Sequence, residues 1–207
     1  MQTQEFINML NRADQVDVEA MVLVADCCTK GLYTDKDDVM GQKYYTLAAD
    51  SGSVPAMLMA GLGYLHGTGI EKNKKLAVKY IKKAADLGHG YAQYLMGVLY
   101  MNGDVGFFNK KQNAYKYFLK AAENGNAEAQ LEVGDAMYTG EGLAQNLEKS
   151  IFWLCCAYLH GDKNLEVSQN AKKRLDFFVE NGVPGGVNRI KKTIVEIKGK
   201  HRDLIQQ

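Results

Sequence analysis

The chain has 207 residues, with 25 basic and 24 acidic side chains and a formal net charge of +1. This near-neutral balance creates no overall field that would attract a polyanion or an anionic membrane, so an electrostatic partner must meet a local patch. The amino-terminal segment lacks a basic stretch followed by an apolar run, and no stretch has the roughly eighteen apolar residues of a membrane span. We therefore expect a cytoplasmic protein.

The chain opens with a predicted helix over residues 3–13 and then repeats itself. Four segments each begin at an alanine, spaced 36, 36 and 37 residues apart, and each ends at a glycine. The opening alanines are Ala20, Ala56, Ala92 and Ala129, and the closing glycines are Gly52, Gly88, Gly125 and Gly161. Such a period is typical of stacked helix–turn–helix units. We assign a capping segment to residues 1–16 and repeats to residues 17–52, 53–88, 89–125 and 126–161.

Each repeat carries the same marks at the same offsets. A small residue on the first helix lets another helix approach closely, and a glycine after that helix provides the left-handed conformation that ends it. The small residues are Ala25, Gly61, Gly97 and Gly134, the ending glycines are Gly31, Gly67, Gly103 and Gly140, and an aromatic residue of the second helix recurs at Tyr44, Tyr80, Tyr117 and Trp153.

Capping residues mark the start of both helices in each repeat. For the first helices the expected amino caps are Asp17, Ser53, the weaker His89, and Asn126; for the second helices they are Asp37, Asn73, Asn109 and Asn146. The third repeat has one extra residue between Gly103 and Ala114, so we expect an irregular turn there.

The chain continues after Gly161 with two further predicted helices. The first covers residues 165–180, and a glycine- and proline-containing break follows at residues 182–186. In the last helix Ile190, Ile194, Ile197, Leu204 and Ile205 recur at helical spacing. We expect residues 162–207 to cap the last repeat, because a solenoid otherwise exposes core at its end.

The second repeat shows the complete pattern, Ala-x4-Gly-x2-Tyr-x2-Gly-x-Gly followed by Ala-x2-aromatic-x3-Ala-Ala-x2-Gly. Its residues are Ala56, Gly61, Tyr64, Gly67, Gly69, Ala77, Tyr80, Ala84, Ala85 and Gly88. The first repeat departs at Cys28, and the fourth has its tyrosine at Tyr138. This pattern resembles the Sel-one-like repeat family, a relative of the tetratricopeptide repeats. The resemblance implies an all-α, right-handed α-solenoid of four helix–turn–helix repeats with helical caps, whose first helices form a concave wall.

By analogy with tetratricopeptide recognition positions, the resemblance implies that first-helix side chains bind a partner. These are Leu58, Leu62, Leu65, Tyr91, Tyr94, Val98, Met101, Asp135 and Tyr138. An apolar, aromatic centre between the acids Asp26 and Asp135 predicts a partner with an apolar segment and basic residues beside it. The alternative is that most of these side chains are simply core.

Basic residues gather in two other places. They are Lys72, Lys74, Lys75, Lys79, Lys82 and Lys83 near the second helix of the second repeat, and Arg189, Lys191, Lys192, Lys198, Lys200 and Arg202 in the tail. Neither group has the interleaved aromatics or reading element of a nucleic-acid site. We expect solvated surfaces and no nucleic-acid partner, with an amphipathic tail on an anionic membrane as the less favoured alternative.

The sequence contains no phosphate loop, zinc helix, nucleophile elbow or Ser-x2-Lys pair, and its four histidines are scattered. The adjacent pairs Cys27–Cys28 and Cys155–Cys156 are poorly placed for a disulfide or a metal, so we expect buried, reduced thiols. Some cysteine-rich members of the resembled family have been proposed to bind or hydrolyse β-lactams, but with regularly spaced disulfides that this chain lacks. We expect no cofactor and no metal.

We therefore predict a non-catalytic scaffold or adaptor that binds a partner protein or peptide in its concave groove. A bacterial immunity protein that neutralises a toxin by direct binding is the alternative within the same class. An enzyme of the β-lactam-hydrolysing type and a nucleic-acid binder are the alternatives from other classes.

Overall fold

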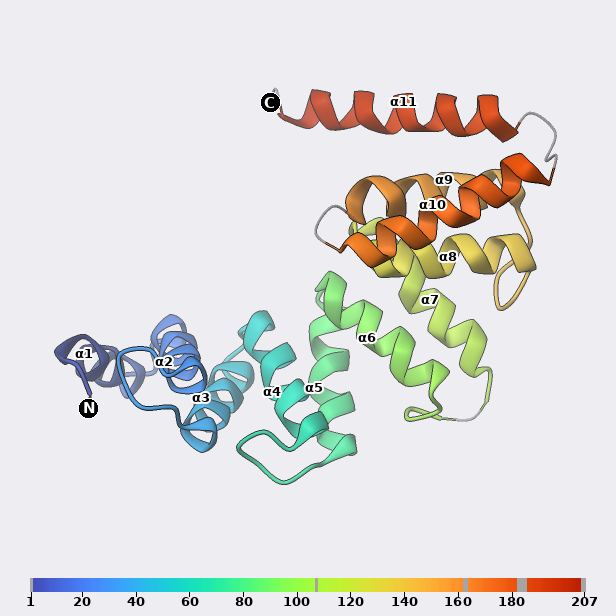
Figure 1. Cartoon of the computed structure of the whole chain (residues 1–207). Helices are drawn as coiled ribbons and strands as arrows, with labels where there is room; N and C mark the ends of the chain where they lie inside the picture. Colours follow the sequence, from blue (N-terminus) through green and yellow to red (C-terminus); the bar gives the residue numbers. More distant parts are fainter. Residues whose placement is uncertain (1, 107, 162–163, 182–185, 206–207) are drawn as a thin grey trace. The chain divides into compact units, whose positions relative to one another are not determined.

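The computed structural model describes residues 2–106, 108–161, 164–181 and 186–205, with side chains as far as residue 199. Over these residues the chain forms α-helices and no strand, as predicted (Figure 1). The helices are α1 (Gln4–Ala13), α2 (Val18–Lys30), α3 (Asp38–Asp50), α4 (Val54–His66), α5 (Lys74–Asp86), α6 (Gly90–Met101), α7 (Lys110–Glu123), α8 (Ala127–Thr139), α9 (Leu147–His160), α10 (Leu165–Glu180) and α11 (Gly186–Ile205).

The chain divides into two compact units, Met1–Met96 and Gly97–Gln207, called here the first and the second unit. In the first unit α1 packs on α2, α2 on α3, α3 on α4, and α4 on α5 (Figure 1). In the second unit α7, α8, α9 and α10 do the same. Each unit is therefore built from helices that are neighbours in both sequence and space.

Side-chain caps begin most helices at the predicted residues. The caps that accept a backbone N–H are Asp17, Ser53 and Asn126 on first helices and Asp37, Asn73 and Asn146 on second helices. His89 also acts as a cap, because its Nδ1 accepts the backbone N–H of Ala92 at 3.3 Å. Asn109 stands directly before α7, as predicted, but its backbone is left-handed, with φ of 50°, and its side chain makes no capping bond. The extra residue in this turn gives the backbone a different path into α7.

The small residue of each first helix faces the second helix of the same repeat. A Cβ added at Gly61 would lie 2.6 Å from Cγ1 of Ile81 and 3.3 Å from the carbonyl oxygen of Ala77. The glycines with corresponding close contacts in later repeats are Gly97 and Gly134. In the first repeat the glycine is on the other helix: a Cβ at Gly41 would lie 3.3 Å from the carbonyl oxygen of Ala25. Both repeats therefore have a close contact between their two helices. The glycine is on the second helix in the first repeat and on the first helix in the second repeat.

Tyrosine pairs connect the two helices of the middle repeats. Tyr64 and Tyr80 stack with ring centres 5.8 Å apart and an interplanar angle of 1°. Tyr100 and Tyr117 stack in the same way at 5.7 Å and 21°. The first repeat has Cys28 at this first-helix position, so the stack is specific to the repeats that keep both tyrosines.

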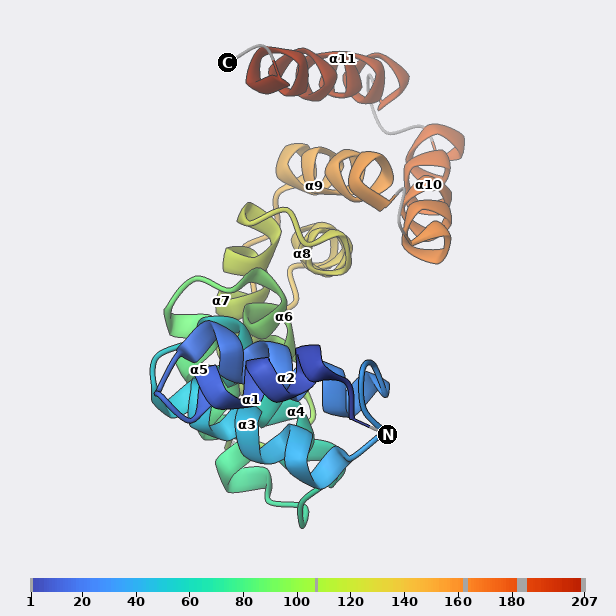
Figure 2. The same cartoon turned by 90° about the vertical axis from the view of Figure 1, so that its left-hand side faces the viewer.

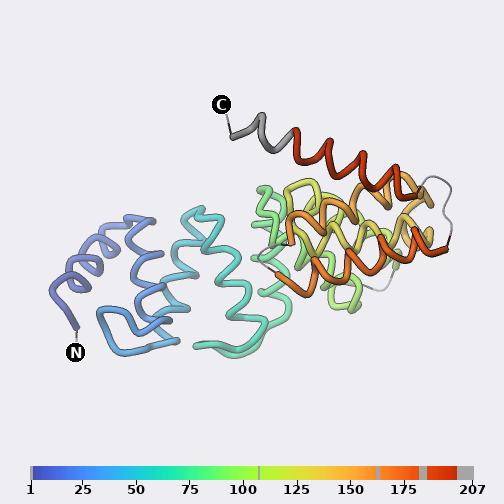
Figure 3. Tube along the Cα trace, turned by 45° about the horizontal axis from the view of Figure 1, so that its top comes forward, coloured from blue at the N-terminus to red at the C-terminus, as the bar shows by residue number. Residues whose placement is uncertain are grey.

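The carboxyl-terminal helices cover α9, as predicted. In α10, which has the predicted bounds, Phe178 is fully buried against α9. Ile190, Ile194 and Ile197 of α11 pack on the same core cluster, and α11 runs alongside α9 (Figures 2 and 3). The side chains of Leu204 and Ile205, and residues 182–185 of the predicted break, lie outside the part of the chain that the structure describes.

Candidate partner-binding surface

The nine predicted groove residues lie on α4, α6 and α8, five in the first unit and four in the second. Leu58 is only 7% exposed and belongs to the core, whereas Tyr91 is 46% exposed. The partly buried members are Leu62, Leu65, Tyr94, Val98, Met101 and Asp135. Partner binding by these side chains stays a prediction.

In the first unit a hollow of about 270 Å³ opens between α2, α3 and α4. Its lining includes Thr29, Gln42, Tyr45, Met59, Leu62 and His66. Gln42 is buried and its Nε2 donates to the carbonyl oxygen of Ala60 at 3.1 Å. A Cβ at Gly63 would overlap the Gln42 amide, so glycine at that position lets the amide cross between the helices. The hollow therefore has a fixed polar wall beside apolar side chains.

A second hollow, of about 620 Å³, lies at the amino-terminal end of α2. Its lining residues are Val18, Glu19, Val22, Leu23, Ser51, Gly52 and Ser53. Leu23 is 40% exposed there. Both hollows border α2, one near each of its ends, and we call this surface, with Val22, Leu23, Met59 and Leu62, the α2–α4 face.

Sequence reasoning missed Met59 and selected Leu58 instead. Met59 is 39% exposed and lines the hollow together with Leu62. Residue spacing does not distinguish the two, because Met59 and Leu58 precede Leu62 by three and four positions and both spacings share a face of a helix. Recognition positions transferred from tetratricopeptide repeats carry no information on how closely α3 packs on α4, so they did not indicate that Leu58 is buried and Met59 exposed.

The two acids expected to flank the groove already have partners within the chain. Asp26 accepts a hydrogen bond from the hydroxyl of Tyr45 and lies 3.4 Å from Nζ of Lys30. Burial, and next the hydrogen bond to Asp26, raise the pKa of Tyr45 above its usual range, so its hydroxyl remains a donor. Asp135 lies 2.8 Å from Nε of Arg174 in α10. These contacts weaken the expectation that a partner must bring basic residues.

Tyr138 lies against α10 in the second unit. Its ring centre is 4.9 Å from that of Phe178 and 6.2 Å from that of Phe177. Together with the Arg174–Asp135 pair, these contacts bring α10 onto part of the α8 surface that was predicted to bind a partner. Less of that surface is therefore open in the second unit than the sequence suggested.

The cysteines and His160 have their partners or their burial within the folded chain. All four cysteines are buried, and burial raises the pKa of Cys28 to about 11 and that of Cys155 to about 12. Nδ1 of His160 lies 3.0 Å from Oε1 of Gln130. Among the residues with described side chains, no three histidine, cysteine or acidic groups gather as metal ligands. None of the described helices is both long and apolar enough to span a membrane.

Comparison with known proteins identifies the repeats. A family model described as Sel1 repeat matches residues 18–53, 54–89, 90–126 and 127–162. A Sel1 repeat protein from Oxalobacter formigenes is 23% identical, with a TM-score of 0.70 over 89% of this chain and 74% of that chain. These matches confirm the predicted all-α solenoid class.

Two further structures extend the comparison. A protective antigen of uropathogenic Escherichia coli that displays an SLR fold is 19% identical, with a TM-score of 0.66 over 93% of this chain and 48% of that chain. This chain thus spans about half of that antigen. An immunity protein from Pseudomonas aeruginosa is 17% identical, with a TM-score of 0.48 over 94% of this chain and 71% of that chain, too low for a functional argument. No curated protein matches the sequence significantly.

Proposed function

This chain belongs to the Sel1 repeat family, and we propose that it is a non-catalytic scaffold that binds a segment of a partner protein on its α2–α4 face. Sel1 repeats are generally protein-interaction modules. That general property supports a partner protein, and the side chains proposed to bind it all belong to the first unit.

The observation that carries the proposal is the presence of exposed apolar side chains beside two hollows. Met59 and Leu23 are 39% and 40% exposed, and each lines a hollow that borders α2. An apolar side chain of a partner that entered the smaller hollow would remove Met59 and Leu62 from water. Burial of this kind, in a pocket whose walls are already packed, supplies most of the energy at protein interfaces.

The walls of the smaller hollow are held in place before any partner arrives. Gln42 is fixed by its bond to Ala60, and the Thr29 hydroxyl donates to the carbonyl oxygen of Ala25 at 2.9 Å. Tyr45 is tied to Asp26. A surface that is already ordered loses less conformational entropy on binding, which favours affinity.

Site-specific photocrosslinking in the source organism tests the proposal. A benzophenone-bearing residue placed at Met59 should crosslink a discrete partner protein. The matched control is the same residue at Leu47, which is 42% exposed on α3 but lines neither hollow. The same crosslinked protein from both positions, or crosslinks from Leu47 alone, would overturn the α2–α4 assignment.

A further inference from the structure

The first turn of helix α5 carries positive charges that do not favour the stability of the helix. Lys74 and Lys75 directly follow the cap Asn73, and the first turn contains no acid. The second helices α3 and α9 have an acid in the first turn, whereas α7, like α5, begins with two lysines and has none. Positive charge at the amino end of a helix opposes the helix dipole. Local stability therefore does not explain Lys74 and Lys75, whereas Lys83, in the last turn, favours the helix dipole.

Three lysines form one row along α5. Lys75, Lys79 and Lys83 follow one another at intervals of four residues and are all exposed. Side chains at this spacing are neighbours on a helix, and like charges there repel. The row extends over about 12 Å at the rise of an α-helix.

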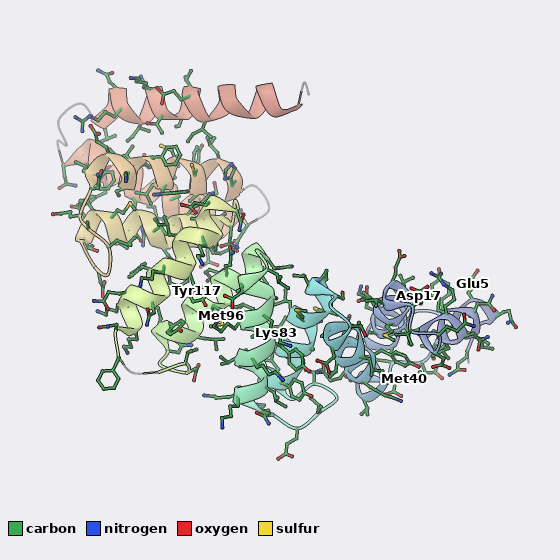
Figure 4. All side chains as sticks on the ribbon, turned by 180° about the vertical axis from the view of Figure 1, so that it is seen from behind. Glu5, Asp17, Met40, Lys83, Met96 and Tyr117 are labelled. Atoms are coloured by element: carbon green, nitrogen blue, oxygen red, sulfur yellow. The ribbon has the colours of Figure 1, made fainter. Side chains whose placement is uncertain are left out.

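Two ammonium groups of this row lie over the ring of Tyr80. Nζ of Lys79 lies 5.7 Å and Nζ of Lys83, labelled in Figure 4, lies 5.9 Å from the ring centre. Tyr80 is itself fixed, because it stacks on Tyr64 and donates its hydroxyl to Asp50 at 3.0 Å. A fixed ring orients the cations, as it does in cation–π contacts generally. The two charges are thus presented by an ordered platform.

The acids near the row limit what can bind to it. Asp86 pairs with Lys82 at 2.5 Å on the adjacent row, Asp50 lies beside Tyr80, and Glu71 precedes the helix. A wide anionic surface, such as a duplex or a membrane, would meet these carboxylates together with the lysines. Tyr80 is only 4% exposed, so its face is not open for a base to stack on. A narrow acidic segment fits the row better.

We propose that Lys75, Lys79 and Lys83 form a second docking surface, which binds an acidic segment of a partner protein. Carboxylates spaced four residues apart on a helix would match the row charge for charge. This surface lies on the second helix of the repeat and shares no residue with the α2–α4 face, so the two proposals stand independently.

Fluorescence anisotropy with two labelled peptides tests this inference on the full chain. One helical peptide carries glutamate at every fourth position, and the other has the same composition in permuted order. We expect tighter binding of the first peptide. The double variant Lys79→Gln and Lys83→Gln should weaken it by about three- to tenfold, in keeping with exposed ion pairs.

Lys82→Gln is the matched control, because Lys82 lies on the same helix but already pairs with Asp86. It should leave peptide binding unchanged, as should Met59→Ala on the other proposed surface. Equal weakening by Lys82→Gln, or no preference between the two peptides, would overturn the proposal. Tighter binding of a phosphatidylserine vesicle or of an RNA duplex than of the glutamate peptide would do so as well. The exposed substitutions should leave the circular dichroism spectrum unchanged.

Discussion

At the scale of single residues, the repeats bring their two helices into close contact with different pairs of small residues. Gly61 faces Ala77 in the second repeat, whereas Ala25 faces Gly41 in the first. In the fourth repeat Gly134 faces Ser150, which is fully buried and donates its hydroxyl to the carbonyl oxygen of Gly134 at 2.7 Å. The required feature is close contact between two helices, with glycine on one side of it.

This arrangement predicts coupling between Gly61 and Ala77. Gly61→Ala should destabilise the fold by about 1–3 kcal/mol, because its Cβ would overlap Ile81 and force the helices apart. Combining it with Ala77→Gly recreates the order of the first repeat. Urea unfolding of the four species should give a loss for the double variant at least about 1 kcal/mol smaller than the sum of the single losses. Simple additivity would show that the two positions do not share one contact.

The cysteines give a second prediction at this scale. Because burial raises the pKa of Cys28 to about 11 and that of Cys155 to about 12, both are protonated thiols at neutral pH and hence poor nucleophiles. Alkylation by iodoacetamide at pH 8 should be slow in the native protein and rapid after denaturation, as mass spectrometry would show. Rapid modification of either cysteine in the native fold would contradict the burial described for it.

At the scale of helices, we expect Lys75 of α5 to lower the stability of the helix while it serves the proposed docking surface. Lys75→Glu places an acid in the first turn and a Glu–Lys pair at positions 75 and 79. Both changes favour the helix, so the free energy of unfolding should rise by about 0.5–1 kcal/mol. Chemical denaturation measures the free energy of unfolding of this variant. Lys82→Glu is the control, because it adds the same charge but removes the ion pair with Asp86. A less stable Lys75→Glu protein would mean that Lys75 has a structural role.

Helix α11 should contribute to the second unit through its buried face. Ile197 is 7% exposed on the α9 core cluster, and Val195 of the same helix is 70% exposed. Ile197→Ala should therefore destabilise by about 2–4 kcal/mol, and Val195→Ala by less than about 0.5 kcal/mol. Deleting residues 187–207 should expose that cluster and promote aggregation, visible by light scattering. Equal, small effects of both substitutions would show that α11 does not stabilise the unit.

For the molecule as a whole, the sequence predicted the features that recur. The period and the caps followed from residue spacing, because each mark occurs in several repeats and local backbone chemistry decides it. The bounds of α10, which lies outside the repeats, were also predicted. An irregular turn before α7 was predicted, but its backbone path was not, since the extra residue there occurs in one repeat alone. Leu58 and Met59 were exchanged because burial depends on the distance between α3 and α4, which no spacing encodes. Likewise, the Arg174–Asp135 pair joins residues that are far apart in the chain.

Titration calorimetry with the partner crosslinked from Met59 measures whether the α2–α4 face binds that protein. Met59→Ala should lose about 1–2 kcal/mol of binding free energy, and Leu47→Ala less than about 0.5 kcal/mol, because only Met59 lines a hollow. Both variants should keep the thermal stability of the parent, since both side chains are about 40% exposed. Equal losses for the two variants, or a loss confined to Leu47→Ala, would contradict the account.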